Sequence, residues 1–227
     1  MNPLPLRLKP FAAVVFDMDG TLLDTEMVFK DVVFEVTKGL GYEMRTEVHL
    51  AMVGSSHEVT NALLVEAYGV AFPYALFEDG CRAAMRLRMA ESVPLKSGAL
   101  EIIKELHGRG LPMAVATSSR RQHADPHLRA AGLFDYLATL VTREDVEHPK
   151  PHPEPYLTAA RRLGVAPDQC LAIEDSHSGV RSAHAAGMQT VMVPDLVLPS
   201  AEIEALCTAV MESLHHVREA AFGLQNA

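Results

Sequence analysis

The sequence feature that most constrains the fold is a short apolar run followed at once by acidic residues. Residues 12–16 are apolar and include two adjacent valines, so they are too few for a helix and predict a strand buried on both faces. Asp17 and Asp19 follow two positions apart, and Gly20 then permits a sharp turn. An Asx turn with solvated acids is the alternative. Because parallel sheets bind ligands at the carboxyl ends of their strands, the buried strand before these acids favours a catalytic site.

From residue 97 onward, amphipathic helices alternate with short buried strands. Together with the opening strand, this pattern predicts five β/α units and an α/β fold, namely a doubly wound, Rossmann-like parallel sheet with helices on both faces. The mildly amphipathic tail over residues 201–221 predicts one more helix packed on this core. The expected strands are 12–16, 112–116, 136–141, 170–173 and 190–193, and the expected helices of the core are 99–107, 122–131, 155–163 and 179–186.

The segment 25–93 shows no strand pattern. A purely helical stretch of about seventy residues is too long for an ordinary crossover connection. We therefore expect an inserted α-helical cap domain over residues 25–93, and an α/β core formed by residues 1–24 and 94–227. The helices expected in the cap are 26–39, 59–68 and 75–90, the second of them capped by Ser56.

Charge and composition argue against several classes of protein. The formal net charge of -9 disfavours a dedicated nucleic-acid binder, since neutralising phosphates requires clustered Lys and Arg. No apolar run has the length of a secretory signal or a membrane span. Cys81, Cys170 and Cys207 are far apart and lack metal-ligand spacing, so a disulfide framework or zinc site is not expected. We expect a cytoplasmic protein that is a monomer or weak homodimer and binds neither nucleic acid nor membrane.

Polar residues also follow three later segments of the core. Thr117, Ser118 and Ser119 come directly after the strand 112–116, where hydroxyls and free backbone N–H groups form an anion cradle, although a simple helix cap has the same composition. Lys150 lies between two prolines in a loop, where a solvated lysine is the alternative. Glu174 and Asp175 follow the strand 170–173 and repeat the acidic pattern of the first strand end.

In a parallel sheet these groups emerge on one rim, so Asp17, Asp19, Glu174 and Asp175 are expected to crowd one pocket. Their mutual repulsion raises their pKa values unless a divalent cation and a lysine offset it. Ligands that are all oxygen favour Mg²⁺ over zinc. The sequence therefore predicts a magnesium site with Lys150 beside it.

Four segments resemble the motifs of the haloacid dehalogenase superfamily of phosphotransferases. They are Phe16–Glu26 (FDMDGTLLDTE), Ala116–Ser119 (ATSS), Pro149–Pro151 (PKP) and Glu174–Ser176 (EDS). The helical insertion resembles the cap of the β-phosphoglucomutase-like group, and residues 185–195 (AAGMQTVMVPD) are similar to a run in glycerol-phosphate and pseudouridine-phosphate phosphatases. Pro149 departs from the pattern, because many relatives have Gly there.

The resemblance implies a Mg²⁺-dependent phosphatase that hydrolyses a small phosphomonoester, such as a sugar, polyol or nucleoside monophosphate. Asp17 would attack phosphorus to give an aspartyl-phosphate, while Asp19 protonates the leaving alcohol and later activates water. The implied metal ligands are Asp17, the backbone carbonyl of Asp19, Asp175 and Glu174, and the implied phosphate-binding groups are Thr117, the Ser118 N–H and Lys150.

Two alternative functions stay open at this point. One is a β-phosphoglucomutase-like phosphotransferase, which shares the intermediate; the cap loop 54–58 carries His57 where mutases typically have Arg, and Phe29 stands where they have His. We expect this loop to select the substrate through His57 and Glu58. The other alternative is a phosphoacceptor signalling domain, although the order of its acidic residues along the chain is different. The role of His177, beside the last motif, is open.

Overall fold

A computed structural model describes residues 8–52, 55 and 57–223. The chain divides into two compact units, one formed by Met1–Asp24 with Pro94–Ala227 and the other by Thr25–Val93. The described part of the second unit contains helices and no strand, whereas the first unit contains a sheet with helices. The boundaries between the units, after Asp24 and before Pro94, coincide with the points along the sequence where the strand pattern stops and resumes.

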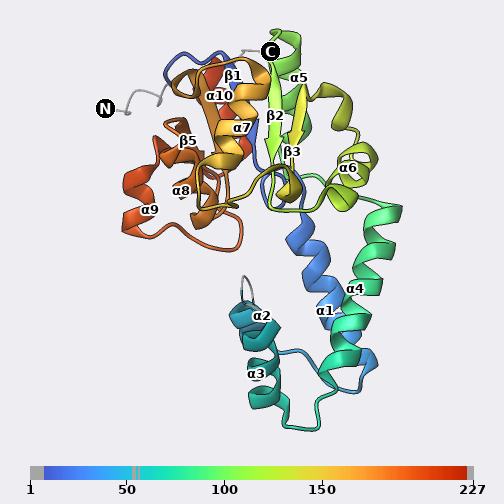
Figure 1. Ribbon diagram of the computed structural model, residues 1–227. Coiled ribbons are helices and arrows are strands. Elements are labelled where there is room, and N and C mark those ends of the chain that lie inside the picture. The colour runs from blue at the N-terminus through green and yellow to red at the C-terminus, as the bar shows by residue number, and fades with distance from the viewer. Residues whose placement is uncertain (1–7, 53–54, 56, 224–227) are drawn as a thin grey trace. The chain divides into compact units, whose positions relative to one another are not determined.

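The first unit is built on a parallel sheet in the order β3-β2-β1-β4-β5-β6 (Figure 1). Every neighbouring pair of strands is parallel. The strand order reverses between β2 and β4 on either side of the central β1, which is the topological switch point where such sheets bind ligands. The expected doubly wound α/β fold is therefore confirmed. The strands are β1 (Ala13–Phe16), β2 (Met113–Ala116), β3 (Thr139–Val141), β4 (Cys170–Glu174), β5 (Gln189–Met192) and β6 (Ala209–Val210).

Helices cover both faces of this sheet because its central strands are apolar on both faces. In β1, Ala13 and Val15 join a buried cluster with Tyr156 of α7 (Glu154–Leu163). The alternate residues Val14 and Phe16 are equally buried and point to the opposite face. α7 contacts α8 (His177–Ala185) on the first face, and α5 (Ala99–Gly108) contacts α10 (Leu214–Phe222) on the other (Figure 1).

The C-terminal tail is not the single helix expected over 201–221. Ser200 caps a short helix, α9 (Ala201–Leu206), and the chain then extends as β6 along the edge of β5. The Thr208 N–H donates to the Thr190 carbonyl at 2.7 Å, and the Met211 N–H donates to the Met192 carbonyl at 2.8 Å. These hydrogen bonds to an open sheet edge outweigh the helical pattern, so that prediction was wrong and the sheet has a sixth strand.

The strand expected over 136–141 is shorter than predicted. Its first residue belongs to a 3₁₀ turn, η1 (Phe134–Tyr136), and only the residues of β3 pair with β2. The remaining elements of the first unit are α6 (Arg121–Ala130), η2 (Arg143–Asp145) and η3 (Pro167–Gln169).

The second unit is a small helical domain with its own apolar core. Its helices are α1 (Thr25–Gly39), α2 (Thr46–Met52), α3 (His57–Tyr68) and α4 (Tyr74–Glu91). The core includes Val32, Leu64, Phe72 and Phe77. α1 and α4 contact each other closely enough that a Cβ at Gly80 would lie 2.9 Å from Val36 Cγ1. The sequence analysis did not predict α2, and the expected cap residue Ser56 lies outside the described residues.

Among the described helices of both units, none combines the length and apolar character needed to cross a membrane.

Candidate active site

The centre of the site is a buried ion pair between Asp17 and Lys150. β1 ends at Phe16, and the backbone N–H of Asp17 still donates to the Ile173 carbonyl of β4 at 2.9 Å, which fixes Asp17 at the end of the sheet. Lys150 Nζ lies 2.6 Å from Asp17 Oδ1 and also donates to Glu174 Oε1. The Lys150 side chain is only 4% exposed, so the loop that carries it turns this cation inward.

The pKa values in this cluster show how its charges are balanced. Burial raises the pKa of Asp17, and the favourable field of Lys150 offsets this only in part because Glu174 and Asp19 add negative charge. Burial alone lowers the pKa of Lys150, but its contacts with Asp17 and Glu174 outweigh that effect and hold the pKa above its usual range. The contacts with Asp17 and Glu174 therefore favour the charged form of Lys150, whereas burial and the neighbouring carboxylates disfavour the ionised form of Asp17.

Glu174 is fully buried, and both of its carboxylate oxygens accept hydrogen bonds. Oε1 accepts from Lys150 and from the Tyr156 hydroxyl, the latter at 2.7 Å. Oε2 accepts from the backbone N–H groups of Asp175 and Ser176, each at 3.2 Å, and from the Ser176 hydroxyl at 2.9 Å. A Cβ at position 179 would lie 1.8 Å from Glu174 Oε1, so only Gly179 leaves room for this carboxylate. Glu174 is thus held rigidly and fixes Lys150 in turn.

Asp175 is a further acidic group of this cluster, and among the described residues no lysine or arginine forms an ion pair with it. Burial is the largest cause of the raised pKa of Asp175, and the negative charges of Asp17 and Glu174 raise this pKa further. Its closest described donor is the Thr21 hydroxyl, 3.5 Å from Oδ1. Gly20, at a φ of 81°, brings the backbone so near that a Cβ there would lie 2.3 Å from Asp175 Oδ2.

This donor set fits a hard divalent cation. One carboxylate oxygen each from Asp17, Glu174 and Asp175 lie within 4.8 Å of one another, and Lys150 alone does not neutralise them. Asp195, which follows β5, adds a buried oxygen: Oδ1 accepts from Lys96 at 2.7 Å, while Oδ2 has no hydrogen-bond partner among the described residues. The described carboxylates outnumber the two lysines that contact them, Lys150 and Lys96, and a set of oxygen ligands matches the preference of Mg²⁺.

The second aspartate of the first motif is held differently from Asp17. Asp19 is half-buried, and its Oδ2 accepts from the Ser119 hydroxyl at 2.7 Å and from the Thr117 hydroxyl at 3.5 Å. Thr117 is buried at the end of β2, and its Oγ1 also accepts the Ser119 N–H at 3.0 Å. Ser118 is exposed. The hydroxyl segment after β2 therefore reaches the acid pair after β1.

Three contacts in this region were not predicted from the sequence. No role was assigned to Tyr156, Asp195 or Lys96, whereas Ser119 belongs to the hydroxyl segment that was expected to form an anion cradle. Asp195 is the one that a sequence signal identifies, because it follows the end of a buried strand as Asp17 and Asp175 do. His177 is the first residue of α8, and its Nε2 bonds the Leu198 carbonyl at 3.0 Å, so its described contact is with a neighbouring loop.

The second unit contains the two expected specificity residues and a cavity. His57 and Glu58 open α3, and both are exposed. His57 Nδ1 lies 3.2 Å from the Tyr74 hydroxyl and 3.4 Å from Glu78 Oε1. Gly54 of the expected loop lies outside the described residues. A cavity of about 340 Å³ has Phe29, Met52, Phe77 and Met85 among its apolar lining residues and Ser55, His57, Thr60 and Arg82 among its polar ones.

The doubly wound sheet holds a buried carboxylate–lysine cluster at its switch point, where α/β enzymes bind their ligands. Similarity to known phosphatases assigns the chain to the phosphoric monoester hydrolases. The model of the haloacid dehalogenase-like hydrolase family matches residues 14–193, and the chain belongs to that family. The resemblance based on the four motifs is thereby confirmed, and the signalling-domain alternative is not supported.

Known members of this family resemble the chain over most of its length. The fructose-1-phosphate phosphatase YqaB of Escherichia coli K12 is 36% identical over 81% of this chain and 96% of its own. A probable pseudouridine-5'-phosphatase of Drosophila melanogaster is 33% identical over 96% of each chain. The crystal structure of a HAD family hydrolase from Deinococcus radiodurans R1, with bound phosphate and sodium, has a TM-score of 0.82 and 30% identity over 93% of this chain and 95% of its own.

Proposed function

We propose that this protein is a Mg²⁺-dependent phosphatase that hydrolyses the phosphomonoester of a small metabolite through an aspartyl-phosphate on Asp17. The observation that carries the proposal is the pairing of Asp17 with Lys150 at the end of the central strand. A carboxylate nucleophile must be ionised in a buried site, and a permanent cation at 2.6 Å favours that ionised form.

The proposed reaction has two displacements at phosphorus. First, a carboxylate oxygen of Asp17 bonds to phosphorus as the ester P–O bond breaks, and the leaving alkoxide takes a proton from Asp19. Then Asp19 accepts a proton from water as the water oxygen bonds to phosphorus and the bond to Asp17 breaks, which releases inorganic phosphate. The two acids can divide these roles because Lys150 contacts Asp17, whereas Ser119 and Thr117 contact Asp19.

Asp17, Asp175 and the backbone carbonyl of Asp19 would hold the Mg²⁺. When bound, the ion neutralises charge that develops on the phosphoryl oxygens. We assign Glu174, which was expected among the ligands, chiefly to holding Lys150, because Oε1 already accepts two donors and Oε2 accepts three.

Thr117, the Ser118 N–H and Lys150 are the proposed phosphate-binding groups. The three come from two neighbouring regions of the rim: Thr117 follows β2, while Lys150 reaches the residue after β1. The exposed position of Ser118 keeps its backbone accessible to a ligand. A tetrahedral dianion needs several donors of this kind, and charge-assisted bonds from lysine are the stronger ones.

We further propose that the helical unit Thr25–Val93 is a cap domain that selects the leaving group. Its cavity combines aromatic and thioether side chains with hydroxyl, imidazole and guanidinium groups, which suits a small alcohol with an apolar face and several hydroxyls. The relatives named for fructose 1-phosphate and pseudouridine 5'-phosphate support a sugar or nucleoside monophosphate as the substrate class.

The deciding experiment measures Mg²⁺-dependent phosphate release from sugar, polyol and nucleoside monophosphates by the Asp17→Asn variant. Turnover should fall by several orders of magnitude, because covalent catalysis depends on that carboxylate. Asp168→Asn is the matched control, since Asp168 is exposed in η3 before β4, at the opposite end of that strand from the site. Turnover of Asp17→Asn within about tenfold of the wild type, a barrier change near 1.4 kcal/mol, would contradict the assignment.

A further inference from the structure

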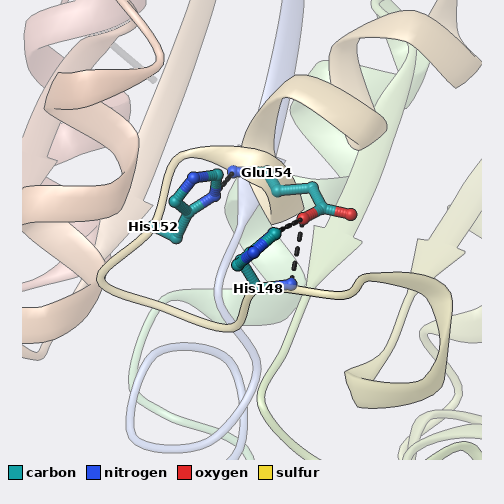
Figure 2. Close-up of side chains that lie close together, drawn as sticks. All are labelled: His148, His152 and Glu154. Carbon is teal, nitrogen blue, oxygen red and sulfur yellow. Dashed lines mark hydrogen bonds and ion pairs between the residues drawn. The ribbon is translucent and has the colours of Figure 1, made fainter.

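The loop that carries Lys150 has a second cluster on its outer side. Its sequence is His148-Pro-Lys-Pro-His-Pro-Glu154, so each non-proline residue is separated from the next by one proline. Lys150 is turned inward, whereas His148 and His152 are exposed and Glu154 is half-buried. Figure 2 shows the three side chains close together, with the His148 ring at the Glu154 carboxylate and the His152 ring at the Glu154 backbone nitrogen.

The potential ligand atoms of this cluster lie close to one another. His148 Nδ1 lies 3.0 Å from Glu154 Oε2, and the two imidazole rings have centroids 4.6 Å apart. One potential ligand atom from each of the three residues lies within 4.8 Å of the others. Two ligands of a tetrahedral ion with bonds of about 2.0–2.1 Å are about 3.3 Å apart. The His148–Glu154 pair, at 3.0 Å, is close to that spacing, and the exposed His152 ring must turn toward the pair to join it.

Glu154 is prepared to act as an anionic ligand. Its carboxylate accepts the backbone N–H groups of Glu147 and His148, each at 2.9 Å, and these bonds lower the pKa of Glu154 to about 2. The carboxylate is therefore ionised at neutral pH and fixed against the start of α7. The only described bond of the His152 ring is a long one, 3.3 Å, from the Glu154 N–H to Nδ1.

We propose that His148, His152 and Glu154 form a binding site for a borderline transition-metal ion such as Zn²⁺ or Co²⁺, separate from the acidic centre around Asp17. Two imidazoles with one carboxylate suit such ions, whereas Mg²⁺ prefers oxygen ligands alone. The three intervening prolines restrict the backbone before the ion arrives, so less conformational entropy is lost on binding. A metal ion at this site would hold the Lys150 loop from its outer side.

The test is a Co²⁺ titration of the full-length protein in excess Mg²⁺, which keeps the acidic centre filled. Visible absorption of bound Co²⁺ reports nitrogen ligation, and the NMR signals of the histidine rings identify the ligands. The wild type is compared with the double variant His148→Ala/His152→Ala. The control is His123→Ala, because His123 and His127 lie one turn apart on α6 with ring centroids 6.2 Å apart and offer a competing histidine pair.

The proposal predicts one Co²⁺ per chain that excess Mg²⁺ does not displace, with at least tenfold weaker binding in the double variant and unchanged binding in His123→Ala. The ring signals of His148 and His152 should be the ones that change in the wild type. Equal Co²⁺ affinity in the wild type and the double variant would overturn the proposal, and so would broadening confined to other histidines. If the double variant does not fold, the ring signals of the wild type decide the question alone.

Discussion

The Tyr156 hydroxyl and the Lys150 ammonium group both donate hydrogen bonds to the same atom, Oε1 of Glu174. The Tyr156 bond measures 2.7 Å, and the residue is fully buried on α7. Lys150 Nζ also lies 5.1 Å from the centroid of the Tyr156 ring. Tyr156 therefore contacts both Glu174 and Lys150, which form an ion pair with each other. Tyr156 thus acts as a positioning residue that ties α7 to the site.

The Tyr156→Phe variant tests this role, because it keeps the ring beside Lys150 and removes only the hydroxyl. Loss of a buried hydrogen bond to a charged group should lower the free energy of unfolding by about 1.5–3 kcal/mol. We also expect kcat to fall about tenfold, because Lys150 is held less precisely, with a smaller change in KM. Denaturant unfolding and steady-state kinetics measure the two effects.

Tyr136→Phe serves as the control for that substitution. The Tyr136 ring packs edge-on against His107, a contact that phenylalanine preserves. Its stability and kcat should match the wild type. A Tyr156→Phe protein with the same stability and kcat as this control would show that the hydroxyl does not position Lys150.

Asp145 should stabilise the protein at neutral pH through its contacts with two arginines. Its carboxylate accepts from Arg121 at 2.7 Å, from Arg162 at 2.6 Å and from the Thr142 hydroxyl at 2.6 Å. Burial alone raises its pKa, but these bonds outweigh burial and hold the pKa of Asp145 below its usual range. Asp145→Asn should therefore lower the free energy of unfolding by about 1–3 kcal/mol at pH 7.

The sign of the pH dependence follows from the depressed pKa of Asp145. Its stabilisation is fully present above the unfolded-state pKa of about 3.9 and is lost as the pH falls below it, so the difference between wild type and Asp145→Asn should shrink from pH 4 toward pH 2. Asp125→Asn is the control, because the exposed Asp125–Arg129 pair lies within one helix and should contribute under about 0.5 kcal/mol. A constant difference across this pH range would show that the arginine contacts do not account for the stabilisation.

The parts of the fold that the sequence predicted well are those fixed by local pattern. The strands β1 and β2, and β4 as far as Ile173, are continuous apolar runs, and β5 ends in the apolar pair Val191 and Met192. Such runs must be buried wherever they lie in the chain. β6 is a two-residue strand whose conformation depends on hydrogen bonds to β5, and no local pattern marks it. α2 is only seven residues long, too short to show a clear period.

The same distinction applies to the site. The order of motifs along the chain predicts that Asp17 and Lys150 meet, because the ends of parallel strands converge. The role of Tyr156 depends on how α7 lies across the sheet, which sequence spacing does not specify. Ser119 belongs to the expected hydroxyl segment, but only the folded turn shows that its side chain, at 2.7 Å from Asp19, is nearer than that of Thr117.

The proposed cap function predicts that His57 and Glu58 influence substrate choice. Replacing both with Ala should change the relative kcat/KM among sugar, polyol and nucleoside monophosphates, since these residues open α3 and His57 lines the cavity. The concentration of Mg²⁺ needed for half-maximal rate should stay the same. The control is Glu66→Ala on the same helix, and an unchanged substrate ranking in the double variant would count against the role of the α3 start.

The last prediction is that water, rather than a second sugar hydroxyl, reacts with the phosphorylated enzyme. A mutase must hold the distal phosphate of a bisphosphate, most effectively with a bidentate arginine. By the family resemblance, His57 stands where the β-phosphoglucomutases typically carry that arginine, and two arginines of α4 form ion pairs. Arg82 pairs with Glu78 and Asp79, and Arg88 pairs with Glu35.

Product analysis with β-glucose 1-phosphate and a glucose bisphosphate primer distinguishes the two outcomes. We expect free phosphate as the main product, because a paired guanidinium must first break its carboxylate contacts before it binds a distal phosphate. Arg86 is exposed on α4 and is the remaining cation to test, so Arg86→Ala should leave the product ratio unchanged. Efficient formation of glucose 6-phosphate without free phosphate, abolished by Arg86→Ala, would instead identify the protein as a mutase whose distal phosphate is bound from α4.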